Sequence, residues 1–80
     1  MTVNVLAFGI VKEIFSGSSV RISLPEGARA AELKAALEQA YPRLQQLASC
    51  LLAVNSEYAA PDKQIYERDE IALIPPVSGG

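Results

Sequence analysis

The N-terminal part of the chain alternates between apolar and polar residues, as strands with one buried face do. We predict a first strand over residues 3–9, with Val3, Val5 and Ala7 on one face and Leu6 and Phe8 on the other. A second strand is predicted over residues 20–24, with three residues pointing inward: Val20, Ile22 and Leu24. Residues 10–15 fit either a helical turn or a loop.

A helical period replaces this alternation over residues 30–41. The apolar residues of the predicted helix fall on one stripe: Ala30, Leu33, Leu37, Ala40 and Tyr41. Pro42 ends the helix because it lacks an N–H and disfavours a helical residue before it. The cap position falls at Ala28 or Arg29, and neither side chain carries an oxygen that accepts a hydrogen bond. Relative to a good cap, this start costs about 1 kcal/mol.

The second half of the chain contains short apolar segments separated by turns. We predict a strand over residues 51–54, a tight turn at Asn55-Ser56 and a short return strand over residues 57–59. A loop over residues 62–69 leads to the last strand, residues 70–74. Pro75 and Pro76 then bar further sheet pairing.

This order of elements predicts an α+β fold of the β-grasp (ubiquitin-like) type, in which a mixed sheet packs on one main helix. The first and last strands are strongly apolar, as central strands are. They would lie side by side and parallel, joined by the helical crossover. We expect one β-grasp domain over residues 1–76 and a C-terminal tail over residues 77–80.

Composition excludes several classes of site. The net charge is −2 and the basic residues are dispersed, which argues against a nucleic-acid or anionic-membrane surface. The chain has no histidine and one cysteine, which argues against a metal site. Cys50 is expected to be a small buried hydrophobe. With no signal sequence and no paired cysteines, we expect a cytoplasmic protein.

The C-terminus carries the most informative motif, Gly79-Gly80. Glycines are slim and can lie extended in a narrow channel. They would deliver the α-carboxylate of Gly80 to such a channel, so we interpret this carboxylate as the reactive group. Pro75 and Pro76 would stiffen the root of the tail and project it from the sheet.

The chain resembles the family of molybdopterin synthase small subunits, which are ubiquitin-like sulfur carriers. The resemblance lies in residues 5–8 (VLAF), 11–14 (VKEI), 51–55 (LLAVN) and, most specifically, 69–80 (DEIALIPPVSGG). Two features depart from the family pattern. The helix lacks the usual Ser or Thr at its start, and Leu73-Ile74 stand where aromatic residues are frequent.

The resemblance implies a sulfur-carrier chemistry at Gly80. An E1-like activating enzyme would adenylate the carboxylate with ATP, and a sulfur source would displace AMP to leave a thiocarboxylate. The large subunit of molybdopterin synthase would then take the tail into its active site, where sulfur passes to a pterin precursor to form the molybdopterin dithiolene. The chain itself would bind no cofactor and have no activity alone.

A docking surface is predicted on the sheet face opposite the helix. Alternation places Phe8 and Ile74 there, and Tyr58 on the return strand beside them, as an exposed apolar patch. Val77 and Ser78 would seat the tail in the partner. Asp69 and Glu70 are interpreted as turn residues and not as a catalytic pair.

Three alternatives remain open from the sequence. The sulfur carrier of thiazole biosynthesis shares the fold, the Gly-Gly ending and the chemistry, but it lacks the Pro-Pro-Val segment. A ubiquitin-like protein modifier would use Gly80 to form an isopeptide bond with lysine. A pure interaction domain would not need Gly79-Gly80.

Overall fold

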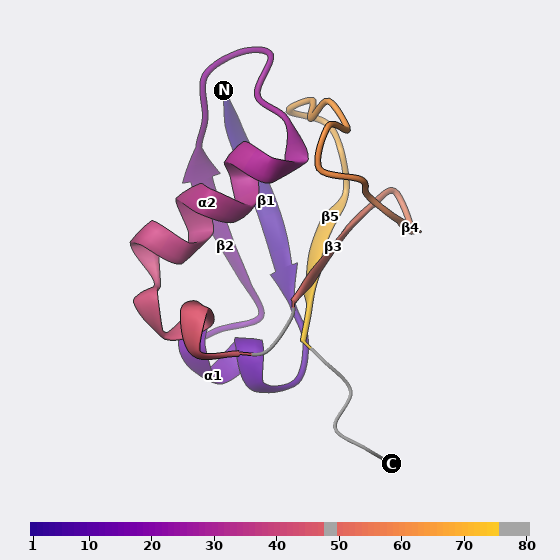
Figure 1. The fold of residues 1–80 in the computed structure, drawn as a ribbon. Coiled ribbons are helices and arrows are strands. Elements are labelled where there is room, and N and C mark those ends of the chain that lie inside the picture. Colours follow the sequence, from indigo (N-terminus) through magenta and orange to yellow (C-terminus); the bar gives the residue numbers. More distant parts are fainter. Residues whose placement is uncertain (48–49, 76–80) are drawn as a thin grey trace.

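A mixed five-stranded sheet with one main helix on its inner face forms the fold of residues 1–47 and 50–75, which are the residues that the computed structural model describes (Figure 1). The elements in chain order are β1 (Thr2–Ala7), α1 (Ile10–Phe15), β2 (Ser19–Ser23), α2 (Ala30–Ala40), the 3-10 helix η1 (Pro42–Gln46), β3 (Leu51–Val54), β4 (Glu57–Tyr58) and β5 (Ile71–Ile74). The predicted β-grasp fold is confirmed.

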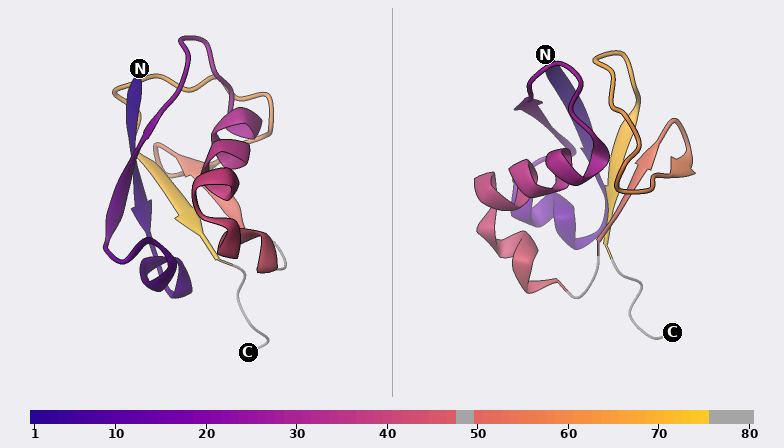
Figure 2. Two further views of the ribbon diagram at one scale, coloured as in Figure 1. Left: turned by 90° about the vertical axis from the view of Figure 1, so that its left-hand side faces the viewer. Right: turned by 45° about the horizontal axis from the view of Figure 1, so that its top comes forward.

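The sheet has the order β2-β1-β5-β3-β4, so β1 and β5 are central. β1 pairs with β5 in parallel and with β2 antiparallel, while β3 is antiparallel to both β5 and β4. The predicted parallel pairing of the first and last strands is therefore confirmed. The left view of Figure 2 shows α2 lying to one side of the sheet.

The hydrophobic core lies between the sheet and α2. Leu33 and Leu37 of α2 are fully buried, and the predicted inward residues of β1 (Val3, Val5 and Ala7) are buried too. Leu52 and Leu73 close the core from β3 and β5. One prediction for α2 was wrong: Ala40 is exposed, because the helix ends there and its last turn extends past the sheet.

The first turn of α2 is held by a loop that is distant in the sequence. Arg29 is the N-cap residue and its side chain caps nothing, as predicted. However, the N–H groups of Ala30 and Ala31 donate to the carbonyls of Lys63 (2.8 Å) and Pro61 (2.9 Å). The N–H of Arg29 also donates to Oε1 of Glu32 at 3.0 Å. Backbone carbonyls therefore satisfy donors that a Ser or Thr cap would otherwise serve.

Several boundaries differ from the predicted ones for local reasons. β1 ends at Ala7 because Gly9 adopts φ 56° and ψ −133°, which no strand contains. Residues 10–15 form the short helix α1, anchored by the buried side chains Val11, Ile14 and Phe15. Ile65, in the predicted loop, is almost fully buried (1% exposed) and belongs to the core.

Candidate functional site

The outer face of the sheet, opposite α2, is organised as two rows of side chains that cross the strands. Residues paired between neighbouring strands point to the same face. The strand register places Leu6 beside Ala72, Ala72 beside Ala53, and Ala53 beside Tyr58. These four residues form the first row, which runs from β1 to β4. Two alanines therefore occupy its centre.

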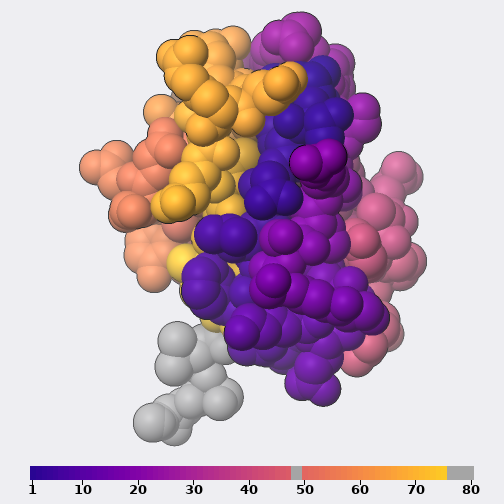
Figure 3. All heavy atoms as spheres, turned by 180° about the vertical axis from the view of Figure 1, so that it is seen from behind, coloured from indigo at the N-terminus to yellow at the C-terminus, as the bar shows by residue number. Residues whose placement is uncertain are grey.

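A second row lies next to the first, towards the end of β5. Ile74 pairs with Leu51. Continuing the parallel register of Leu6 and Ala72 by two residues brings Phe8 beside Ile74. The sheet face that carries both rows is seen in Figure 3, where β1 is indigo and β5 is yellow-orange.

The two rows enclose a shallow depression of about 350 Å³. Alanines make its floor, because their side chains are too short to fill the space between larger neighbours. Its lining residues are Leu6, Phe8, Ala53, Ser56, Tyr58, Glu70, Ala72 and Ile74. We call this surface the outer depression. It is apolar at the centre, with Ser56 and Glu70 supplying polar groups.

The structure brings together the three patch residues that the sequence singled out. Phe8 is 47% exposed and Tyr58 is 69% exposed, whereas Ile74 is partly buried. Tyr58 does not stand beside Ile74 as expected: β3 lies between β4 and β5, and the small Ala53 keeps the depression continuous. The role of these residues in partner binding stays a prediction.

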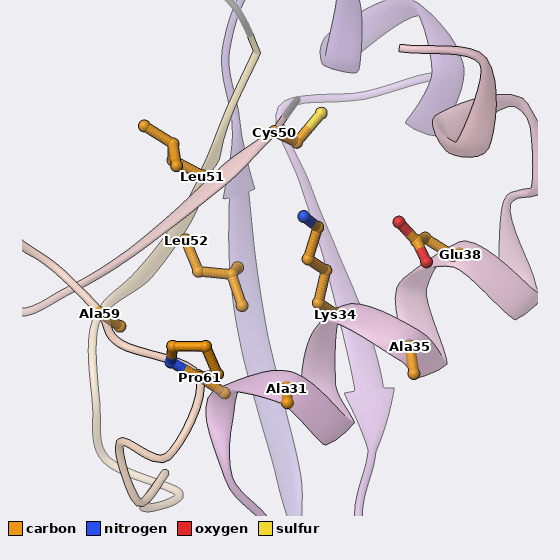
Figure 4. Close-up of a pocket in the computed structure, with 10 residues that line it drawn as sticks. Ala31, Lys34, Ala35, Glu38, Cys50, Leu51, Leu52, Ala59 and Pro61 are labelled. Atoms are coloured by element: carbon orange, nitrogen blue, oxygen red, sulfur yellow. The ribbon is translucent and has the colours of Figure 1, made fainter. Parts of the chain in front are cut away.

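Leu51 was missed by the sequence reasoning. It is 50% exposed and shares a row with Ile74. Figure 4 shows it projecting away from α2, whereas the next residue, Leu52, points towards the helix. Strict alternation along residues 51–54 would have identified Leu51, but the continuous apolar run concealed it.

The root of the C-terminal segment adjoins the outer depression. Pro75 follows Ile74 directly and is partly buried. The remaining predicted tail residues, Pro76, Val77, Ser78, Gly79 and Gly80, lie outside the described residues, as does the predicted boundary between domain and tail.

Asp69 and Asn55 form a structural network at the opposite end of the sheet. Oδ1 of Asp69 accepts from Nδ2 of Asn55 (3.1 Å), and Oδ2 accepts from the N–H of Tyr66 (2.8 Å). Oδ1 of Asn55 accepts from the N–H of Glu70 at 3.0 Å. Asn55 itself has φ 53°, as the turn requires. These bonds support the interpretation of Asp69 as a turn residue.

Cys50 lies on the inner side of the sheet, where it lines a pocket of about 390 Å³ between α2 and β3 (Figure 4). It is buried, as predicted. Burial raises the pKa of its thiol, the charge of Lys34 opposes this shift, and the charge of Glu38 adds to it. A protonated thiol is a weak nucleophile and metal ligand, so this pocket offers no activated cysteine.

Across residues 1–47 and 50–75, no group of three or more Cys, Asp or Glu side chains is placed to hold a metal ion. In the same part of the chain, no helix has the length and apolar character needed to cross a membrane.

Comparisons with known proteins agree with this arrangement. A model of the ThiS family matches residues 5–80. The molybdopterin synthase sulfur carrier subunit of Dictyostelium discoideum is 42% identical over 81 residues, covering 96% of this chain and 94% of that protein. SAMP1 from Haloferax volcanii is 27% identical, with a TM-score of 0.85 over 100% of both chains.

A complex of subunits 1 and 2 of the molybdopterin-converting factor from Helicobacter pylori is also similar. One of its chains is 28% identical to this chain, with a TM-score of 0.69 and 100% of both chains covered. The match to the family extends over both rows of the outer face and through Gly80. The chain therefore belongs to the ThiS family, and the resemblance to molybdopterin synthase sulfur carrier subunits is confirmed.

Proposed function

We propose that this protein is the sulfur carrier subunit of a molybdopterin synthase, with Gly80 as the sulfur-bearing residue. The observation that carries the proposal is the likeness to relatives of nearly the same length, 42% and 36% identical, that bear the name molybdopterin synthase sulfur carrier subunit. The family match, which reaches through the terminal Gly79-Gly80, agrees with it.

The proposed chemistry uses the backbone terminus and no side chain. The Gly80 carboxylate attacks the α-phosphate of ATP on an activating enzyme, and pyrophosphate leaves. A sulfur nucleophile then displaces AMP from the acyl adenylate, which leaves a thiocarboxylate. Its sulfur is anionic at neutral pH and needs no neighbouring base, which suits a chain without histidine. The thiocarboxylate sulfur bonds to a carbon of the pterin precursor in place of an oxygen substituent, which gives a thioester. Water then attacks the Gly80 acyl carbon and cleaves its C–S bond, which leaves the sulfur on the pterin and returns Gly80 to a carboxylate.

The outer depression is the proposed docking surface for the large subunit. Its apolar floor and partly exposed aromatic walls have the composition of an interface core. A partner side chain of Leu or Phe size would fill the space above Ala53 and Ala72. Glu70, at the edge of the depression, would meet a cationic group of that partner.

The proposal assigns the chain a donor role within a larger enzyme. No turnover is expected without the large subunit, and ATP would be consumed by the activating enzyme and not bound here. We expect these reactions in the cytoplasm, where an unpaired thiol such as Cys50 stays reduced.

The intact mass of the chain tests this proposal. The chain is incubated with ATP, a sulfur source and the activating enzyme of the same organism. One oxygen-for-sulfur exchange, located in the C-terminal peptide, is the expected result. An unchanged mass, under conditions in which a known carrier is converted, would refute the proposal.

Gly79→Val tests the narrow-channel interpretation of the tail. The fold should be unaffected, since residue 79 follows the last strand, but sulfur transfer should be abolished because a branched side chain blocks the channel. Gly79→Ala is the matched comparison at the same position, and its single methyl group should lower sulfur transfer less than the valine side chain does. Equal transfer rates for Gly79→Val and wild type would contradict the narrow-channel interpretation.

A protein modifier is the second candidate, and the structural likeness to SAMP1, described as a small archaeal modifier protein, favours it. Immunoblots of cell lysates separate the two functions. A ladder of conjugates that disappears when Gly80 is deleted supports the modifier, whereas a single band supports the carrier.

A further inference from the structure

The loop between β1 and α1 reaches the root of the C-terminal segment. Ala7 pairs with Leu73 in the parallel register of β1 and β5. Beyond the ends of these two strands, Gly9 and Pro75 stay close to each other. A Cβ added to Gly9 would lie 3.2 Å from Cγ of Pro75, closer than nine in ten real contacts of a Cβ.

Gly9 is held in place from both sides. Its carbonyl accepts from the N–H of Lys12 at 3.1 Å, and the carbonyl of Phe8 accepts from the N–H of Val11 at 3.1 Å. Val11 is fully buried, so it ties this loop to the core. The backbone at Gly9 has φ 56° and ψ −133°, a conformation that side chains rarely permit.

Pro75 is equally constrained. Its ring fixes φ near −65° and removes the N–H, so one backbone torsion is locked and the residue cannot donate to the sheet. Ile74 before it is anchored by pairing with Leu51. The contact between Gly9 and the Pro75 ring therefore joins two rigid parts of the chain.

We propose that Gly9 is a positioning residue for sulfur transfer. Because Gly9 has no Cβ, the Pro75 ring can pack against the loop between β1 and α1. This packing, which we call the Pro75 seat, sets the direction in which the chain leaves β5. The inference rests on the proposed function, because it concerns the delivery of Gly80. Phe8, on the wall of the outer depression, is adjacent to Gly9. The same loop thereby sets the docking surface and the root of the tail relative to each other.

The geometry explains why a small shift at this root matters. The five residues from Pro76 to Gly80 span at most about 18 Å when fully extended. For a tail that lies extended, as the narrow-channel interpretation requires, a tilt of about 10° at Pro75 displaces the far end by about 3 Å. Misplacement of a reacting group by about 1 Å can lower a rate about a hundredfold.

Four variants test the proposal: Gly9→Ala, Pro75→Ala, the double variant, and Gly27→Ala as the control. Gly27 also has a positive φ (85°), but nothing lies within 4 Å of an added Cβ there. Each variant is converted to the thiocarboxylate. Its affinity for the large subunit, its thermal unfolding and its single-turnover transfer rate at saturating large subunit are then measured.

We expect Gly9→Ala to lower the transfer rate about tenfold with unchanged affinity, and Pro75→Ala to lower it about threefold by removing the seat. The double variant should transfer clearly faster than the product of the two single losses, because the collision with the ring is gone and only the backbone strain at residue 9 remains. Independent effects would instead multiply to about thirtyfold. Gly27→Ala should transfer at the wild-type rate.

Three results would overturn the inference: equal transfer by Gly9→Ala and Gly27→Ala, a double variant at the multiplied rate, or a wild-type rate for Pro75→Ala. If Gly9→Ala does not fold, the transfer rate of Pro75→Ala alone tests the inference. A wild-type chain that takes up no sulfur would refute the proposed function, and this inference with it. A wild type that transfers sulfur, with variants that match it, would refute the inference alone.

Discussion

The two faces of the sheet are made by the same strands but differ in what fills them. On the inner face, Leu52 and Leu73 meet Leu33 and Leu37 of α2, and all four are buried. On the outer face, Ala53 and Ala72 occupy the centre and leave the outer depression. Residues adjacent in sequence therefore serve different purposes. Large inward side chains stabilise the fold, and small outward ones leave the depression that we propose as the docking surface.

Leu73→Ala and Ile74→Ala test this contrast with two neighbours on one strand, and the largest effect is expected here. Leu73→Ala should lower the free energy of unfolding by about 2–5 kcal/mol, because it opens a cavity in the core. Ile74→Ala should lower it by about 1 kcal/mol or less, since this side chain is partly solvated. Urea unfolding measures both. Equal losses would show that the faces do not differ as described.

Ala53→Leu would fill the floor of the outer depression. Affinity for the large subunit should fall at least tenfold, about 1.4 kcal/mol, because the added side chain takes the place of the partner group. Stability should change little. Ala40→Leu makes the same change at an exposed position on α2 and should leave affinity unchanged. Titration calorimetry on both variants decides whether the depression is the docking site, and equal affinities would contradict it.

Cys50 reports on the closed inner face through the pH dependence of its alkylation. Its raised pKa means that less thiolate exists at neutral pH than in an unfolded chain, so iodoacetamide should react severalfold more slowly. The rate should rise only above the ordinary thiol pKa. Because the pKa of Cys50 is raised in the folded chain, the protonated thiol favours folding below the ordinary thiol pKa. This contribution to stability is lost as the pH rises through the raised pKa.

Lys34→Met is the companion variant for this measurement. Removing the cation that opposes the shift should raise the pKa of Cys50 further and slow alkylation again. The urea-unfolded chain supplies the reference rate. Alkylation of the native chain at the reference rate would mean that the pocket is open to solvent.

Arg29→Thr should give the smallest effect, a gain of about 0.5 kcal/mol. Only the N–H of Glu32 is left for a threonine hydroxyl, because the N–H groups of Ala30 and Ala31 already have partners. The melting temperature should rise by about 2–4 °C. Calorimetry measures it, with Arg29→Ala as the control that offers no oxygen. A melting temperature equal to that of the control would reject the assigned cap.

Local patterns predicted the elements of this fold well, since each depends on neighbouring residues. Alternation identified β1 and β2, Pro42 ended α2, and the strand order gave the parallel pairing of β1 and β5. Phe8, Tyr58 and Ile74 were placed on one face by the same rule. Leu51 was not, because a run of four apolar residues has no visible alternation.

Features that depend on distant residues could not be predicted. The carbonyls of Pro61 and Lys63 meet the first turn of α2 only after the chain has folded back. Ile65 lies in the same segment as these carbonyls, and it is buried because this segment packs against the start of α2. The close approach of Gly9 and Pro75 arises only after two strands separated by most of the chain have paired.

The central position of β5 has a consequence for synthesis on the ribosome. β1 emerges early, but its parallel partner is the last strand of the described chain. The edge of β1 that pairs with β5 must therefore stay unpaired until residues 71–74 have been made. Such an edge invites association with other chains. Nascent copies should accordingly depend on chaperones or on rapid post-translational folding, whereas the mature protein presents no such edge at β1.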